Sequence, residues 1–245
     1  MNRRTFMITT ALATLGAGLL PSAVTSFLVT PAQAEDMPDT SEIFDLTLGD
    51  KDAPLEVIEY ASYTCPHCAN FHSQVFEPLK KDYIDTGKVR FIYREVYFDK
   101  FGLWASMVAR CGGEMRYFGV QKMLYDEQSD WIAGGKDTMQ IVENLRKIGK
   151  RAGLTDENLD ACLNDGDMAE KLYAKFTAEV AEYDINATPT LVIGGERFSN
   201  MSYDKLKEVL DAKLEGTAVP EDAMTPEEAQ NKAIVDGLVE TLGKD

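Results

Sequence analysis

The chain has 245 residues and a formal net charge of −16, with 41 acidic side chains against 25 Lys and Arg. An acidic excess of this size repels phosphate backbones and anionic lipid, which argues against a nucleic-acid partner. The length allows one domain with an insertion or two small domains.

The N-terminal segment has the pattern of an export signal. Arg3-Arg4 precedes an apolar run, Met7–Leu20, and the small residues of Ala32-Gln33-Ala34 form a cleavage pattern. We therefore expect cleavage after Ala34. The adjacent arginines resemble a twin-arginine signal, and the sequence leaves that route and the general secretory (Sec) route both open.

A strand–helix–strand unit follows. The alternating segments Ile43–Leu48 and Leu55–Tyr60 predict strands, and apolar residues spaced by four from Cys65 predict an amphipathic helix that stops at Asp85. The segment Lys88–Phe98 predicts a third strand. This order is typical of a βαβ unit with a parallel pair of strands.

A helical region separates these strands from two more. Helical spacing dominates residues 101–185, where Gly and Asp clusters divide it into about four helices. Thr190–Ile193 and Glu196–Phe198 then predict a hairpin around Gly194-Gly195, and Tyr203–Leu214 predicts a helix. The expected fold class is α/β, with a central mixed sheet and an inserted all-helical domain.

The chain thus divides into five parts. They are the export signal (1–34), the first part of the α/β domain (35–100), the helical insertion (101–185), the second part of the α/β domain (186–216), and a linker with a short helix (217–245).

Cys65 and Cys68 stand where the second strand gives way to the helix. A Cys-x-x-Cys pair beside a βαβ pattern is typical of a redox-active disulfide. Cys65 would be the exposed attacking thiol, and Cys68 the thiol that resolves the mixed disulfide.

The pKa of Cys65 decides the direction of the chemistry. A helix N-terminus stabilises an anion by at most about 2 kcal/mol, and one pKa unit corresponds to about 1.4 kcal/mol. A larger depression of the pKa needs hydrogen bonds to the sulfur, for which the backbone N–H groups of His67 and Cys68 and the imidazole of His67 are the candidates.

Glu59 lies in an apolar strand six residues before Cys65. A buried carboxylate there could exchange a proton with Cys68, whereas a carboxylate at the rim of the strand would be solvated or salt-bridged. The sequence leaves both interpretations open.

Thr188-Pro189 opens the later strand. We expect a cis bond at Pro189, with the backbone of Thr188 facing the cysteine pair and able to hold an extended substrate; the alternative is an ordinary trans proline at an edge strand.

The other two cysteines, Cys111 and Cys162, each fall on an apolar helical face. Export favours a structural disulfide between them over two separate buried thiols. The bridge would close a loop of about 52 residues and stabilise the fold by roughly 4 kcal/mol.

His67 and His72 are the only histidines. Together with Cys65 and Cys68, His72 raises the alternative of a zinc site, but the second ligand pair of a structural site is missing. We expect no metal.

Four features together resemble the DsbA family of periplasmic thiol:disulfide oxidoreductases. They are the Cys65-Pro66-His67-Cys68 motif, Thr188-Pro189, the helical block between two thioredoxin-like halves and the export signal. The run Glu59–Ser62, Phe71-His72 and the extra cysteines look most like the alphaproteobacterial branch of that family.

The resemblance implies a periplasmic enzyme that donates its Cys65–Cys68 disulfide to unfolded exported polypeptides with thiols. A membrane partner similar to DsbB, linked to quinones, would re-oxidise it, and no cofactor is needed beyond the redox-active disulfide. By position, the resemblance assigns nucleophile and buried partner to Cys65 and Cys68, thiolate stabilisation to His67, the buried acid to Glu59 and the cis proline to Pro189.

Two other functions stay open on this scaffold. A disulfide isomerase or reductase would normally need an added N-terminal dimerisation domain, for which Glu35 to the first strand leaves only about eight residues. A non-catalytic chaperone or metal-binding module would be favoured by an incomplete cysteine pair, whereas this chain has both cysteines.

Overall fold

The protein is described here by a computed structural model, which covers residues 38–132 and 137–223. The expected export signal and the helix expected after Thr225 lie outside the described residues. Within them, no helix is both long and apolar enough to cross a membrane.

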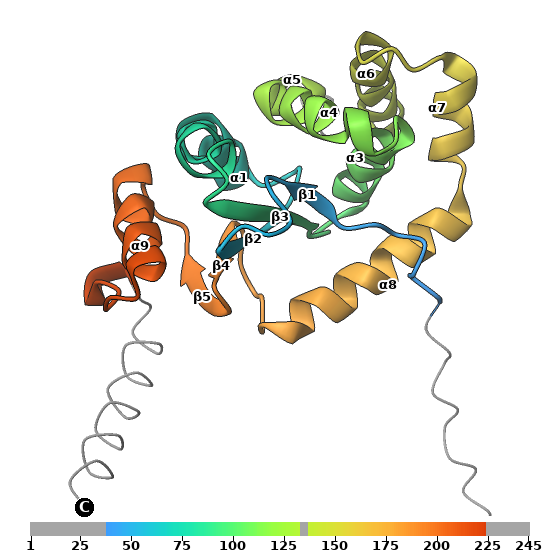
Figure 1. Ribbon diagram of the computed structural model, residues 1–245. Coiled ribbons are helices and arrows are strands. Elements are labelled where there is room, and N and C mark those ends of the chain that lie inside the picture. The colour runs from blue at the N-terminus through green and yellow to red at the C-terminus, as the bar shows by residue number, and fades with distance from the viewer. Residues whose placement is uncertain (1–37, 133–136, 224–245) are drawn as a thin grey trace, which may run out of the picture. The chain divides into compact units, whose positions relative to one another are not determined.

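A five-stranded mixed sheet lies at the centre of the described chain (Figure 1). Its spatial order is β1-β3-β2-β4-β5. The strands are β1 (Leu46–Leu48), β2 (Leu55–Ala61), β3 (Val89–Glu95), β4 (Thr190–Ile193) and β5 (Glu196–Ser199). The expected parallel pair is confirmed, since β2 and β3 run parallel with Val57 opposite Phe91.

Two strands are shorter than the sequence predicts. Ile43 lies before β1, although its side chain is buried, and Phe98 lies after β3 with 60% of its surface exposed. Alternation continues at both places, but the strand pairing that defines the sheet ends at Leu46 and Glu95.

The hairpin between β4 and β5 follows its turn chemistry. Gly194 and Gly195 have φ angles of +57° and +84°, a left-handed pair that suits a two-residue turn of type I′. The prediction of a tight hairpin at these glycines is confirmed.

The helix after the cysteine motif alternates between α and π turns. Its segments are α1 (Pro66–Phe71), η1 (His72–Phe76), α2 (Glu77–Leu79) and η2 (Lys80–Ile84). The sequence predicted one amphipathic helix here, and its buried face is present, with Phe71, Val75 and Leu79 in the core.

Six helices lie between β3 and β4 in the described residues, rather than the four or so that the sequence indicates. They are α3 (Lys100–Cys111), α4 (Glu114–Asp126), α5 (Gln128–Ile132), α6 (Thr138–Arg151), α7 (Asp156–Leu163) and α8 (Gly166–Glu182). One extra break follows α6, where Gly153 takes a φ of +86° and Thr155 caps α7 with a capping box.

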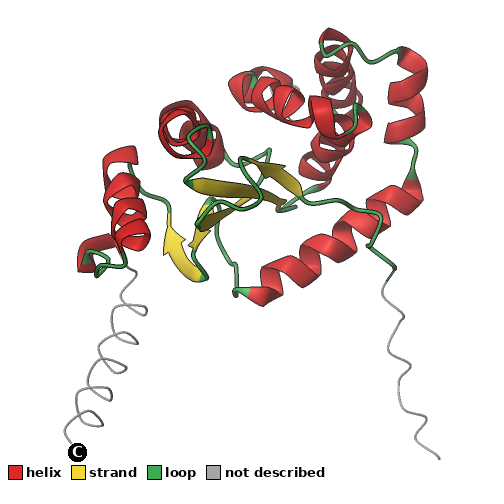
Figure 2. Cartoon of the chain, in the orientation of Figure 1, coloured by secondary structure: helices red, strands yellow, loops and turns green. Residues whose placement is uncertain are grey.

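Helices cover both faces of the sheet (Figures 1 and 2). On one face, Val57 and Phe91 share a core with α1 and with α9 (Tyr203–Glu215). On the other face, Ile58 and Ile92 pack against Phe176 and Val180 of α8. Both faces of β2 are therefore closed to solvent, and Glu59 on this strand is fully buried.

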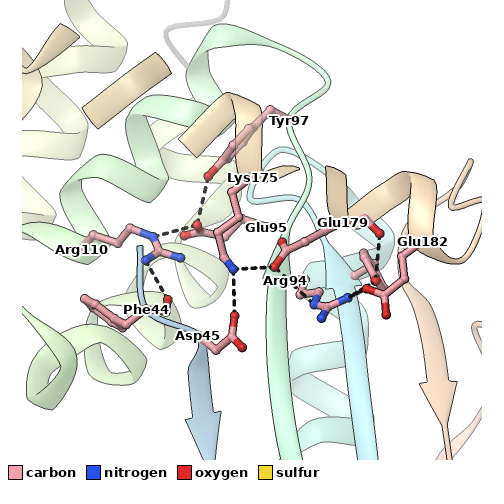
Figure 3. A network of polar contacts seen from close by, with 10 residues as sticks. Phe44, Asp45, Arg94, Glu95, Tyr97, Arg110, Lys175, Glu179 and Glu182 are labelled. Atoms are coloured by element: carbon pink, nitrogen blue, oxygen red, sulfur yellow. Dashed lines mark hydrogen bonds and ion pairs between the residues drawn. The ribbon is translucent and has the colours of Figure 1, made fainter. Parts of the chain in front are cut away.

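A polar network fastens the helical block to the sheet (Figure 3). Glu95, at the end of β3, accepts hydrogen bonds from Arg110 Nε at 2.8 Å, Tyr117 at 2.8 Å and Tyr97 at 3.0 Å. Nearby, Lys175 of α8 bridges Asp45 and Glu179, each at 2.9 Å. These contacts join α3, α4 and α8 to the same edge of the sheet.

The chain beyond α9 packs against the body as far as it is described. Val219 and Ala223 are 7% and 8% exposed and belong to the main core, and the short η3 turn covers Glu221–Ala223. The segment that the sequence marks as a linker is thus partly buried.

Candidate active site

The two cysteines of the motif lie at the start of α1. Cys65 is the N-cap residue, with extended backbone angles, and Pro66 occupies the first helical turn, where its missing N–H leaves no bond unmade. Both thiols are free, and Cys68 is fully buried whereas Cys65 is partly exposed. Only the first sulfur can be approached by another protein.

Hydrogen bonds to its sulfur lower the pKa of Cys65 to about 5. The hydrogen bond from the Cys68 thiol lowers this pKa most. Burial raises it, and hydrogen bonds from Thr188 and from the backbone N–H groups of Cys68 and His67 lower it further. The expectation that local hydrogen bonds rather than the dipole alone set this pKa agrees with these contacts. At neutral pH Cys65 is a thiolate.

The pKa of Cys68 is strongly raised. Burial is the main cause, and the hydrogen bond to Cys65 and the nearby charge of Glu59 act in the same direction. Cys68 therefore stays protonated and donates to the Cys65 sulfur. Two thiols three residues apart have opposite protonation states.

His67 is exposed to solvent, whereas its backbone N–H forms a hydrogen bond with the Cys65 sulfur. The stabilising role of the imidazole ring stays a prediction.

The Thr188–Pro189 segment faces the cysteine pair from the start of β4. The peptide bond is cis, as expected from the sequence, and the Thr188 carbonyl oxygen lies 3.4 Å from Cys65 Sγ, a hydrogen bond that Cys65 donates only in its protonated thiol form. This backbone is thus placed where a chain bound to Cys65 would pass.

Glu59 is buried rather than placed at the rim of its strand. Its side chain is 0% exposed, and its Oε2 lies 3.1 Å from Nε2 of His72, which is 7% exposed. Of the two alternatives in the sequence, burial holds, and the carboxylate contacts an imidazole. His72 is thereby engaged with Glu59, and no cluster of three His, Cys, Asp or Glu side chains suited to a metal occurs within the described ranges.

Gln128 is a site residue that sequence reasoning missed. From the first position of α5 its Nε2 donates to the carbonyls of Tyr63 at 2.8 Å and Cys65 at 3.0 Å. Tyr63, in turn, shares a hydrogen bond of 2.5 Å with Tyr117, which donates to Glu95. The helical block thus holds the loop that carries the nucleophile.

The remaining cysteines lie elsewhere in the helical block. A disulfide joins Cys111, at the end of α3, to Cys162 of α7, at a sequence separation of 51. The pairing favoured by the sequence is present.

Comparison with known proteins places this arrangement in a family. A family model described as thioredoxin matches residues 41–212. A putative protein-disulfide oxidoreductase of Rickettsia bellii is 32% identical over 200 residues, covering 77% of this chain and 76% of the relative. One from Rickettsia typhi is 34% identical over 172 residues, which span 62% of its length.

Solved structures agree with these sequences. Wolbachia pipientis alpha-DsbA1 superposes with a TM-score of 0.64 at 26% identity, covering 73% of this chain and 97% of that one. Oxidised BdbD from Bacillus subtilis has a TM-score of 0.62 at 25% identity, with 70% and 94% covered.

Proposed function

The chain belongs to the thioredoxin family as a DsbA-like protein-disulfide oxidoreductase, and from this we propose that it works as an oxidase, donating the Cys65–Cys68 disulfide to exported proteins. Thiol–disulfide exchange is common to the family. The direction of exchange, the substrates and the roles of single residues make up the proposal.

The opposite pKa shifts of the two cysteines are the observation that supports an oxidase. Lowering the pKa of Cys65 to about 5 stabilises the reduced form, because the disulfide form has no thiolate to stabilise. A stabilised reduced form makes the disulfide form a strong oxidant. A reductase would need the reverse preference.

The exchange proceeds in two displacements. A substrate thiolate attacks Cys65 Sγ, breaks the Cys65–Cys68 bond and leaves Cys68 as a thiolate, which takes up a proton because its pKa is strongly raised. A second substrate thiolate then attacks the substrate sulfur of the mixed disulfide and releases Cys65 as a thiolate. Counted from two substrate thiols, the substrate loses two electrons and two protons; the enzyme gains both electrons and one proton, and the other proton goes to water.

Three further residues have roles in this scheme. The carboxylate of Glu59 exchanges the proton of Cys68, the backbone of Thr188 beside Pro189 holds the substrate chain, and His67 stabilises the thiolate. The burial of Glu59 and the Thr188–Cys65 contact support the first two roles. No cofactor besides the disulfide takes part.

We place the reaction in the periplasm, on unfolded exported polypeptides with thiols. The export pattern of residues 1–34 supports this compartment. Return to the disulfide form requires an oxidant, for which a DsbB-like, quinone-linked membrane protein is the partner we propose.

The redox equilibrium with glutathione tests the direction. An oxidase is more stable when reduced, so the urea midpoint at pH 7 should rise on reduction, and glutathione buffers should hold the pair mostly reduced. A midpoint that falls on reduction would instead indicate a reductase or a structural bridge.

The isomerase alternative needs a separate assay. Refolding of scrambled and of reduced ribonuclease should differ: an oxidase accelerates the recovery of reduced ribonuclease and leaves the scrambled form largely inactive. Efficient recovery from the scrambled form would contradict the proposal.

A further inference from the structure

Glu59 and His72 form a buried acid–imidazole pair near the Cys65–Cys68 motif. Glu59 and His72 are 0% and 7% exposed and meet at 3.1 Å through Oε2 and Nε2. The second carboxylate oxygen, Oε1, is buried and has no hydrogen-bond partner among the described residues. An acid in this position has one oxygen engaged and one left for another proton donor or acceptor.

Cys68 lies near the Glu59–His72 pair. Its thiol is fully buried and feels the charge of Glu59. Tyr125 lies against both, because its ring stacks on His72 with centroids 4.2 Å apart and its hydroxyl group feels the charges of Cys68 and Glu59. Cys68 thus lies within electrostatic reach of Glu59, which contacts His72.

A pocket includes His72 in its wall. Its volume is about 260 Å³, and His72, Phe76, Phe118 and Tyr125 contribute to its wall together with charged residues of α2 and α4. Gln121, also in the wall, is 1% exposed, and its amide nitrogen has no hydrogen-bond partner in the described chain. The inner wall of the pocket therefore carries polar groups suited to hold water.

The backbone at His72 departs from regular helix. His72 is the first residue of the π turn η1, and such turns occur frequently at functional sites. The ring is held between Tyr125 and Phe76, whose centroid lies 4.7 Å away. The imidazole is fixed toward Glu59 rather than free to turn.

We propose that His72 relays protons between Glu59 and this pocket, so that the proton of Cys68 enters and leaves the enzyme away from the surface where the substrate binds. The inference rests on the proposed function in taking Cys68 as the resolving thiol. During substrate oxidation the relay delivers one proton to the Cys68 thiolate; during re-oxidation it removes that proton as Cys68 attacks.

The pair also has a purely structural interpretation, in which His72 only partners a buried acid. Two substitutions separate the two roles. His72→Gln keeps a hydrogen-bond donor toward Glu59 but cannot pass a proton on, and His72→Phe keeps the aromatic stack on Tyr125 but removes both nitrogens. Phe198→Leu, at a buried aromatic position of β5 outside the wall of this pocket, is the matched control.

The step to measure is attack of Cys68 on a Cys65–glutathione mixed disulfide, followed as glutathione release from the full exported chain at pH 7. Proton transfer by a positioned group contributes about 100-fold or more to such a step, and we expect both His72 variants to slow release by at least about tenfold. Phe198→Leu should stay within about twofold of wild type. The pKa of Cys65, read from thiolate absorbance, should be the same in all four proteins.

Two further measurements make the test decisive. Imidazole added to His72→Ala should restore glutathione release, because the enlarged pocket admits the missing ring. Glu59→Gln combined with His72→Phe should be no slower than Glu59→Gln alone, since two groups in one relay fail together. If His72→Phe fails to fold, the release rate of His72→Gln and the imidazole rescue of His72→Ala still show whether His72 relays protons.

Wild-type release rates in His72→Gln, or no rescue of His72→Ala by imidazole, would overturn the relay. Neither outcome touches the oxidase proposal, which fails separately if reduction lowers the urea midpoint of the wild-type protein. The proton relay and the oxidase function can thus be tested independently of each other.

Discussion

The two thiols of the redox pair differ because their surroundings differ at the scale of single contacts. Cys65 lies at a helix start with the Cys68 thiol and backbone N–H groups directed at its sulfur. Cys68, one turn later, lies in a closed core beside the charge of Glu59. Local hydrogen bonding favours the anion at the first position, and burial disfavours it at the second.

The stability of the reduced protein should depend on pH through Cys65. Its pKa falls from an ordinary 9.0 to about 5 on folding, so the stabilisation is complete above pH 9 and is lost as pH falls through 5. At pH 7 about half of the shift is expressed; about 1.4 kcal/mol per unit gives roughly 2–3 kcal/mol as an upper bound, because solvent screens this partly exposed sulfur and reduces the effect.

Urea unfolding of the reduced protein between pH 4 and 9, with Cys65→Ser as the control, measures this dependence. The difference in unfolding free energy between the two proteins should grow with pH. A difference that stays constant over this range would show that Cys65 is not a stabilised thiolate.

At the scale of elements, the loop before the redox helix, which begins with α1 at Pro66, is held by α5 of the helical insertion. Gln128 of α5 supports the carbonyls of Tyr63 and Cys65, and Asp99 both caps α3 and accepts a hydrogen bond from the Thr64 hydroxyl at 2.8 Å. The loop before α1 is thus fixed from two helices. The insertion contributes to the site by fixing the loop on which Cys65 lies.

Gln128→Leu should destabilise the protein by about 1–3 kcal/mol, because the buried carbonyl of Tyr63 loses its donor. Gln140→Leu, on the exposed face of α6, is the control and should change stability by less than about 0.5 kcal/mol. Urea unfolding of the oxidised forms gives both values. Equal effects would argue against a special role for Gln128.

Arg110 is the cation of the network at the end of β3. Its removal in Arg110→Met leaves the buried carboxylate of Glu95 without a counter-charge, for which we expect a loss of about 3–5 kcal/mol. The double variant Glu95→Gln/Arg110→Met should recover much of this loss, and the exposed Arg116→Met should change little. Thermal unfolding compares all three, and a double variant no better than Arg110→Met would contradict the argument.

At the scale of the whole molecule, the disulfide between α3 and α7 closes a loop of 51 residues in sequence separation. The chain-entropy argument gives about 4 kcal/mol for its effect on stability. Cys111→Ser/Cys162→Ser should lose about this much in urea unfolding while keeping the low pKa of Cys65. The denatured, oxidised wild-type protein should label with no thiol reagent, and two reactive sulfurs would contradict the presence of this bridge.

Much of the fold follows from local patterns. Alternation, the cysteine spacing and the glycine pair predict the parallel unit, the start of the redox helix and the hairpin, because each depends on neighbours in sequence. The partner of Glu59 could not be predicted, since the contact with His72 depends on a π turn. The role of Gln128 could not be predicted either, because only the packing of α5 brings its side chain to a loop 63 residues away in sequence.

The same limit applies to the helical insertion. Its apolar stripes were visible in the sequence, but the break after α6 depends on two single residues, Gly153 with its positive φ and the N-cap residue Thr155.

The π turns in the redox helix have a consequence for how this helix tolerates changes in length. Phe71, Val75, Leu79 and Tyr83 are all buried and recur every four residues. In a regular α-helix that spacing drifts by about 40° per step, and the two π turns widen the coil so that the stripe runs straight. Deleting one residue would rotate everything beyond it by about 100°, so we expect this helix to accept substitutions at its exposed positions but neither insertions nor deletions.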